Sequence, residues 1–155
     1  MKPSDKVQAT LDALGSDIRV IEFDVATATA DQASAAAGCE LGAIVKSLLF
    51  LIDGKPVLVL VAGDRMTDQR KLASHFRVGK KKVRLADPVI VRETTGYEVG
   101  GVPPVGHDVR LPVFIDQSLG RFETVWAAAG SSNAIFPISL SKLREICDGH
   151  IIENA

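Results

Sequence analysis

Cysteine, aromatic residues and long apolar runs are all scarce in this sequence of 155 residues. It contains 2 Cys, 1 Trp and 1 Tyr, and no apolar run reaches the roughly 18 residues that a membrane-spanning helix needs. These shortages argue against a disulfide-stapled scaffold and against a membrane span. Because residues 1–6 also lack a hydrophobic signal region, we expect a cytoplasmic protein without a membrane partner.

The familiar catalytic signatures are missing as well. The sequence has no G-x-S-x-G elbow, P-loop, G-x-G-x-x-G, H-E-x-x-H or C-x-x-C. His75, His107 and His150 are scattered, so we expect no metal and no other cofactor. Cys39 and Cys147 are also far apart, and we interpret them as small packing residues rather than as a disulfide or a nucleophile.

What the sequence does contain is a hydrophobic fraction of 46%, enough for one folded domain over residues 1–155. Its net charge is −1, but the charge is unevenly spread. Residues 65–84 hold one acid, Asp68, and eight basic residues, a net charge of +7. The basic residues are Arg65, Arg70, Lys71, Arg77, Lys80, Lys81, Lys82 and Arg84. This pattern is typical of a phosphate-binding surface, or of a solvated helix face followed by a lysine-rich turn.

Periodicity and turn residues predict a mixed α+β fold. Two apolar β-branched runs, 43–52 and 56–62, flank Asp53-Gly54-Lys55, which is a strong hairpin signal. Further strands are expected at 18–25, 83–85, 112–116, 123–128 and 133–138. Helices are expected from Ser4 or Asp5 to Gly15, and at 29–37, 67–76, 87–94 and from Ser139 or Ser141 to 147. We therefore expect a curled, mostly antiparallel mixed sheet around the hairpin, with flanking helices.

Lys46 is the first candidate for chemistry. Strand alternation places Ile44, Lys46 and Leu48 on one face and Val45 and Ser47 on the other, so the lysine has apolar neighbours on both faces. Burying an unpaired ammonium is costly. Lys46 must extend past the strand end, pair with an acid, or line a cavity that binds an anionic or carbonyl-bearing ligand.

The second candidate is the glycine- and proline-rich segment 96–107. Its Gly100 and Gly101 would let the backbone approach a ligand closely, and Pro103 would hold the loop stiff. Such a loop offers backbone N–H donors to an ester oxyanion, and His107 could orient a substrate. The alternative interpretation is a tight structural turn.

The third candidate follows Trp126. Gly130, Ser131 and Ser132 end an expected strand with small and polar residues. They would form the wall of a compact pocket, or simply an ordinary hairpin turn.

Together these segments resemble the YbaK/EbsC family of freestanding aminoacyl-tRNA deacylases, which is similar to the editing domain of bacterial prolyl-tRNA synthetase. The resemblance runs in order from about residue 29 to residue 149. The segments that carry it are Lys46-Ser47-Leu48-Leu49-Phe50, Asp53-Gly54, 58–62, Ala86-Asp87-Pro88, Thr95-Gly96-Tyr97, 100–107 and Gly130-Ser131.

This resemblance implies a compact curled sheet and hydrolysis of the ester of mischarged tRNA without a protein nucleophile. It implies that Lys46 is the essential lysine and that Gly101 belongs to the family's glycine loop. Pro103 to His107 differs from the pattern of the cysteine-specific members, which favours another subgroup.

We therefore expect a trans-editing enzyme that removes a small amino acid, such as Ala, Ser, Thr or Cys, from tRNA, with proline tRNA as the expected carrier. Gly100, Pro103, His107, Gly130, Ser131 and Ser132 would bind the substrate, and Arg70, Lys71, Arg77, Lys80, Lys81 and Lys82 would bind tRNA. We expect a monomer, with an aminoacyl-tRNA synthetase as a further candidate partner. Two alternatives stay open, a non-catalytic nucleic-acid-binding module and a small-ester hydrolase.

Overall fold

The structure is a computed structural model that describes residues 1–155. Its α-helices are α1 (Pro3–Ala13), α2 (Ala30–Ala37), α3 (Gln69–Phe76), α4 (Pro88–Thr95) and α5 (Leu140–Cys147). Its strands are β1 (Ile21–Glu22), β2 (Ile44–Ile52), β3 (Lys55–Ala62), β4 (Val83–Leu85), β5 (Val113–Asp116), β6 (Thr124–Ala128), β7 (Ala134–Ser139) and β8 (His150–Ile152). Three short 3-10 helices, η1 (Leu41–Ala43), η2 (Lys80–Lys82) and η3 (Gln117–Arg121), complete the set.

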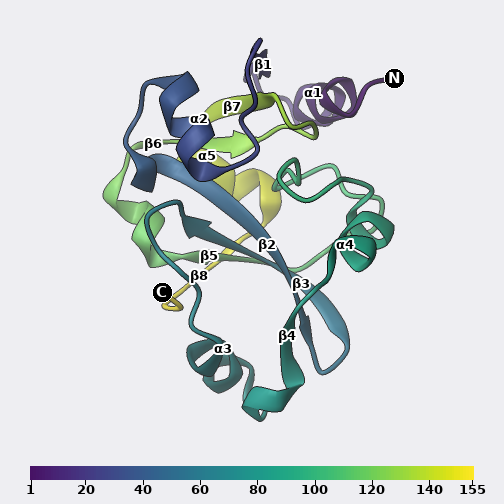
Figure 1. Ribbon diagram of the computed structural model, residues 1–155, viewed down its shortest axis with the longest axis vertical. Helices are drawn as coiled ribbons and strands as arrows, with labels where there is room; N and C mark the ends of the chain where they lie inside the picture. The colour runs from purple at the N-terminus through teal and green to yellow at the C-terminus, as the bar shows by residue number, and fades with distance from the viewer.

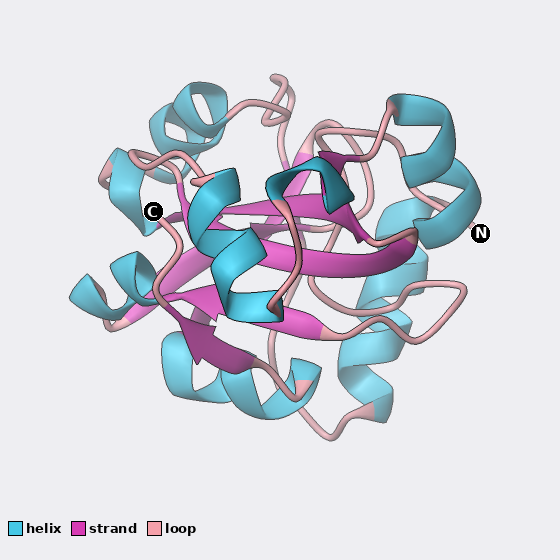
Figure 2. Ribbon diagram, turned by 90° about the horizontal axis from the view of Figure 1, so that it is seen from below, coloured by secondary structure: helices cyan, strands magenta, loops and turns pink.

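All eight strands join one mixed sheet, in the order β1-β7-β6-β2-β3-β5-β8, with β4 paired to β2 beyond the end of β6. Four of the strand pairs are antiparallel and three are parallel. Figure 2 shows the strands running through the middle of the molecule with helices on both sides. The predicted α+β class, with a mixed sheet and flanking helices, is confirmed.

The predicted hairpin lies at the centre of this sheet. Its two turn residues, Asp53 and Gly54, both have positive φ, 51° and 81°, as a two-residue hairpin turn requires. The turn joins Ile52 to Lys55, and the ladder then runs without a bulge to Val45 opposite Ala62. The sheet therefore has β2 and β3 as neighbouring central strands, and most of their side chains are apolar and buried.

Side chains of β2 alternate between two differently covered faces. Val45 and Leu49 join the main core, which α1, α4 and α5 cover. On the opposite face, α2 packs over Ile44 at the start of β2, and α3 packs over Phe50 near its end. Figure 1 shows these two helices far apart, above and below β2. Lys46 is on this second face, between the two helix-covered patches.

Several predicted boundaries were wrong. The strand expected at 18–25 is only Ile21–Glu22, because it pairs with the edge of the sheet over two residues. The short strand His150–Ile152 at the opposite edge was not predicted. Helix α3 is capped by Asp68 instead of Thr67, because the Asp68 carboxylate accepts from the N–H groups of Arg70 and Lys71. Helix α1 begins at Pro3, before the predicted Ser4 or Asp5 cap.

Candidate active site

A cavity of about 330 Å³ lies where the start of β2 meets α2, β6, β7 and the glycine-rich loop. Eleven of its sixteen lining residues are hydrophobic. The lining residues are Thr27, Ala28, Thr29, Ala30, Ala33, Ile44, Val45, Lys46, Ser47, Leu48, Val99, Gly100, Val102, Trp126, Ala128 and Ile135. Lys46 is the only charged residue among them, so any charged or polar ligand in the cavity meets a single positive group.

The cavity coincides with a gap along one edge of β2. On that edge β6 pairs with β2 only at Ile44 and Val45, and β4 begins to pair at Phe50. The Gly63 N–H donates to the Ile44 carbonyl, so even-numbered residues of β2 bond β3 and odd-numbered residues face the other edge. The backbone N–H and C=O of Ser47 therefore point into the gap. They add one backbone donor and one backbone acceptor to a mostly apolar cavity.

Lys46 extends along the cavity wall toward the turn after β3. Its ammonium donates a hydrogen bond to the carbonyl of Arg65, and no carboxylate lies within 4 Å of it. Burial lowers the pKa of Lys46 from its ordinary value, and the nearby Asp64 carboxylate opposes this shift. Since an ammonium carries three N–H donors, two remain for a ligand.

Two hydroxyl groups of lining residues have no hydrogen-bond partner. They are Thr27 Oγ1, on a residue that is only 4% exposed, and Ser47 Oγ. An unsatisfied buried hydroxyl costs roughly 1–3 kcal/mol. Both hydroxyl oxygens are buried away from solvent, and the Ser47 side chain is on the face of β2 opposite Lys46, so neither is a free donor facing the cavity.

The glycine-rich loop contributes Gly100 to the cavity wall, but it does not offer the Gly101 N–H to an oxyanion as the sequence predicted. Gly100 lines the cavity as expected, with φ of 90°. Gly101 does not line it, and its N–H donates to the Glu98 carbonyl at 3.0 Å, so this N–H is not free for an oxyanion. The Gly101 carbonyl instead accepts from the Gly130 N–H at 2.8 Å. A Cβ on Gly101 would lie 3.0 Å from the Gly130 carbonyl oxygen, so a side chain there would crowd the contact between the two loops.

His107 and Pro103 were expected to bind substrate, but the structure places neither on the cavity wall. His107 Nε2 lies 2.6 Å from the Pro103 carbonyl, which closes the loop upon itself. The His107 ring borders a different hollow, between α1 and α5. Burial lowers the pKa of His107, which favours the neutral ring. The structure thus gives His107 a role in holding the loop, because the ring bonds the loop's own backbone.

Gly130, Ser131 and Ser132 also lie behind the cavity wall instead of in it. Ser131 Oγ donates to the Asn133 side chain at 3.0 Å, and the Ser132 carbonyl accepts from the Thr27 N–H at 2.7 Å. The first bond lies within the turn after β6, and the second attaches this turn to the segment that carries Thr27. The three residues were predicted as substrate contacts, and in this structure they support the wall from outside.

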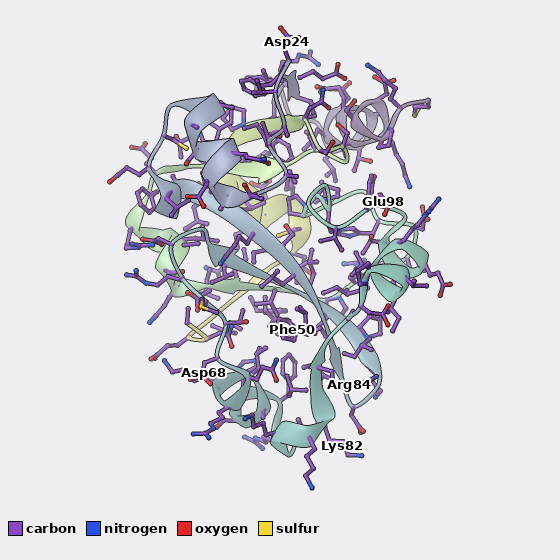
Figure 3. All side chains as sticks on the ribbon, viewed as in Figure 1. Asp24, Phe50, Asp68, Lys82, Arg84 and Glu98 are labelled. Carbon is purple, nitrogen blue, oxygen red and sulfur yellow. The ribbon has the colours of Figure 1, made fainter.

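All six predicted tRNA-binding residues are exposed and none lines the cavity. Lys80, Lys81 and Lys82 lie at the far end of β2, whereas Lys71 contacts Glu153 and Ala155 near the C-terminus. Val83 pairs with Ile52, six residues along β2 from Lys46, which corresponds to about 20 Å. Figure 3 shows Lys82 projecting from this end of the molecule, opposite the end that carries Asp24. Of the six, only Lys71 and Lys82 have a carboxylate within 4 Å.

Sequence reasoning did not find most of the cavity wall. Thr27, Ala28 and Ala33 reach it through α2 and the segment before it, while Trp126 and Ile135 reach it through β6 and β7. The sequence indicated this part of the wall only through the alanine-rich helix expected at 29–37, which has small side chains on one face. Which strands such a helix covers depends on the sheet order, and the sequence does not encode that order locally.

Other reactive groups are absent from the site. No three His, Cys, Asp or Glu side chains come close enough together to hold a metal ion. Burial raises the pKa of the Cys147 thiol to about 11, so it is not a thiolate at neutral pH.

None of the helices is both long and apolar enough to cross a bilayer.

Comparison with known proteins shows what the chain resembles. Residues 24–146 match the model of the aminoacyl-tRNA editing domain. The chain is 40% identical over 127 residues to the uncharacterized protein YwhH of Bacillus subtilis, covering 81% of this chain and 79% of that one. It is 35% identical over 123 residues to the proline–tRNA ligase of Maridesulfovibrio salexigens, covering 76% of this chain but only 20% of the ligase.

A solved structure supports the same assignment. The chain aligns with a protein described as a "putative trans-editing enzyme for prolyl tRNA synthetase", with a TM-score of 0.92 and 35% identity. The alignment covers 99% of this chain and 97% of that one. The predicted family resemblance is thereby confirmed, together with the deacylase class and a tRNA substrate. The protein belongs to the aminoacyl-tRNA editing domain family.

Proposed function

We propose that this protein is a trans-editing enzyme that hydrolyses the ester between a small amino acid and the 3′ end of proline tRNA. The observation that carries the proposal is the position of Lys46. It is the only charge on the wall of a small apolar cavity, and it has no carboxylate partner within 4 Å. Such a lysine is suited to an anionic or carbonyl-bearing ligand.

Lys46 would use its two remaining N–H donors on the terminal phosphate or on the ester carbonyl of the substrate. Water then adds to the carbonyl carbon, the bond to the ribose oxygen breaks, and that oxygen leaves with a proton. No side chain at the site has the environment of an activated nucleophile, which supports attack by a positioned water. The Ser47 N–H, which faces the gap, is a candidate donor to the developing oxyanion.

Selection would come from the size of the cavity. Its wall combines Ala28, Ala30 and Ala33 with larger apolar side chains from β6 and β7. A pocket discriminates one methylene by only about 10–200-fold. We therefore infer that Ala, Ser, Thr or Cys fits and that larger side chains are excluded by steric contact.

The exposed cations beyond the far end of β2 would hold the acceptor stem. Contacts to phosphates position a nucleic acid without reading its sequence. The separation of about 20 Å from Lys46 leaves room for the unpaired 3′ end to reach the cavity while the stem lies on η2 and α3. We further propose that the protein acts as a monomer in the cytoplasm, where it would complement an aminoacyl-tRNA synthetase.

The two alternatives predict a different response to salt. A non-catalytic nucleic-acid-binding module would bind tRNA without releasing the amino acid. A small-ester hydrolase would cleave a model ester at a rate that salt hardly changes, whereas tRNA binding weakens steeply as salt rises. A lysine in the cavity that has no carboxylate partner favours catalysis over binding alone.

The experiment that tests the proposal is a deacylation panel at one fixed salt concentration. Proline tRNA charged with Ala, Ser, Thr, Cys or Pro is incubated with the protein, and release of each amino acid is followed. We expect at least one small amino acid to be released much faster than Pro. Intact esters throughout the panel, or equal release of all five, would contradict the proposal.

A further inference from the structure

We propose that the ion pair between Asp64 and Arg121 is a positioning element for Lys46 and acts through the turn that follows β3. The pair itself does not line the cavity. This inference rests on the proposed function, in which Lys46 is the catalytic residue.

The turn that receives Lys46 is short and tightly held at its start. The Arg65 N–H donates to the Ala62 carbonyl at 2.9 Å, which closes the turn, and the Arg65 carbonyl accepts the Lys46 ammonium. Within the turn, a Cβ on Gly63 would lie 2.4 Å from the Leu41 carbonyl oxygen, so the turn packs directly against η1 and has no room for a side chain there. Asp64 and Arg65 are exposed and need another anchor.

Arg121 supplies that anchor from η3. Its Nη1 and Nη2 donate to the two carboxylate oxygens of Asp64 at 2.9 and 2.6 Å, and its Nε donates to the Ser118 carbonyl at 2.7 Å. A two-point bond between a planar guanidinium and a carboxylate fixes orientation as well as distance. The Asp64 side chain is only 30% exposed and that of Arg121 37%, so the pair is more sheltered than a typical surface pair.

The pair also controls charge near Lys46. Asp64 and Arg65 face Lys46 from the turn, Arg121 approaches from η3, and Glu40 acts on Arg121. The other walls of the cavity carry no charge. Hydrogen bonds from Arg121 lower the pKa of Asp64, whose carboxylate lies more than 4 Å from the Lys46 ammonium. Without Arg121, Asp64 keeps only its longer contact to Arg65 Nη1, at 3.4 Å, and can turn toward Lys46 and occupy the donors that the substrate needs.

The test compares Asp64→Asn and Arg121→Met with Arg121→Lys, which keeps the charge but loses the two-point bond. Arg19→Met is the matched control, because Arg19 forms an exposed ion pair with Asp12 on α1, away from the cavity. Three quantities are measured for each variant: the single-turnover deacylation rate, the Kd for tRNA, and the pKa of Lys46 from the ¹³C NMR signal of its side chain.

We expect Asp64→Asn and Arg121→Met each to slow deacylation roughly 10- to 100-fold, because a misplaced catalytic group costs about that much. The Kd for tRNA should stay within twofold of wild type. The pKa of Lys46 should fall in Asp64→Asn, which removes a negative charge, and rise in Arg121→Met, which removes a positive one. Arg121→Lys should give an intermediate rate. A purely structural pair would lower Tm without moving the pKa of Lys46 in opposite directions.

Deacylation by Asp64→Asn and Arg121→Met at the rate of Arg19→Met would overturn the proposal, as would a Lys46 pKa that neither change moves. If one variant fails to fold, Arg121→Lys still decides, since a wild-type rate in that variant contradicts the need for two-point geometry. The proposed function fails separately, if Lys46→Ala keeps the wild-type rate. An inactive Lys46→Ala beside fully active Asp64 and Arg121 variants rejects only the present inference.

Discussion

The two ends of strand β2 present positive charge in different ways. At its start, Lys46 is a single cation with one backbone partner and a mostly apolar cavity beside it. Toward and around its other end, six exposed basic residues are spread over α3, its cap Arg77 and η2, and most have no carboxylate within 4 Å. One end has a fixed geometry that depends on one lysine, and the other end has many interchangeable charges.

This difference indicates how the two regions should respond to substitution. Where one group is held by a defined set of contacts, a small displacement affects the reaction strongly. Where several cations share a diffuse surface, the loss of one changes affinity little, and the sum matters. Substitutions at the cavity end should therefore act on the deacylation rate or on folding, and those at the basic end on tRNA affinity.

The largest expected effect on stability is at Gly130, behind the cavity wall. Its φ is 97°, and a Cβ there would lie 2.7 Å from the Pro3 carbonyl oxygen. Gly130→Ala should therefore lower the free energy of unfolding by about 2–4 kcal/mol. Gly120→Ala is the control, because nothing lies within 4 Å of the Cβ it adds. Denaturant unfolding measures both, and equal stability of the two variants would show that the contact between Gly130 and Pro3 is not tight.

At the basic end, replacing Lys80, Lys81 and Lys82 together by Ala should weaken tRNA binding. The slope of log K against log salt should become shallower by up to about 3, because each lost phosphate contact removes close to one unit. The deacylation rate at saturating tRNA should stay near wild type. A filter-binding salt series measures the slope, and an unchanged slope would move the tRNA site elsewhere on the surface.

A smaller effect is expected at His107, which closes the glycine-rich loop. Burial lowers its pKa in the folded state, so the unfolded chain binds a proton more readily. Stability from the neutral ring is complete above the unfolded pKa of about 6.5 and is lost as pH falls toward the lower folded value. The Tm advantage of wild type over His107→Gln should therefore shrink between pH 7.5 and pH 5. An advantage that grows on acidification would mean that the folded protein favours the charged ring.

Most of the fold could be predicted because its signals are local. The hairpin at Asp53-Gly54, the Asp87-Pro88 helix start and the Gly38 helix end each depend on backbone preferences of a few residues, and each is present in the structure. The strand at 18–25 was predicted too long, because its pairing depends on how far β7 extends beside it. Strand β8 was missed, because three residues carry too little pattern.

The candidate site was predictable only in part, for a similar reason. Lys46 was identified because an ammonium between apolar strand positions needs a partner, and the structure gives it a cavity and the Arg65 carbonyl. His107 and Ser131 were placed on the wall because polar residues in loops are typical of sites. They in fact bond the backbone and side chains around them. Such local hydrogen bonds are set by loop conformation, which spacing along the chain does not determine.

The most direct test of the central claim is the Lys46→Ala variant, studied by single-turnover deacylation and by thermal unfolding together. Removing a cation that has no carboxylate partner strands no buried charge, so we expect a Tm close to wild type. We expect deacylation of the best substrate in the panel to be abolished. A stable Lys46→Ala protein that deacylates at the wild-type rate would contradict the assignment of this cavity as the active site.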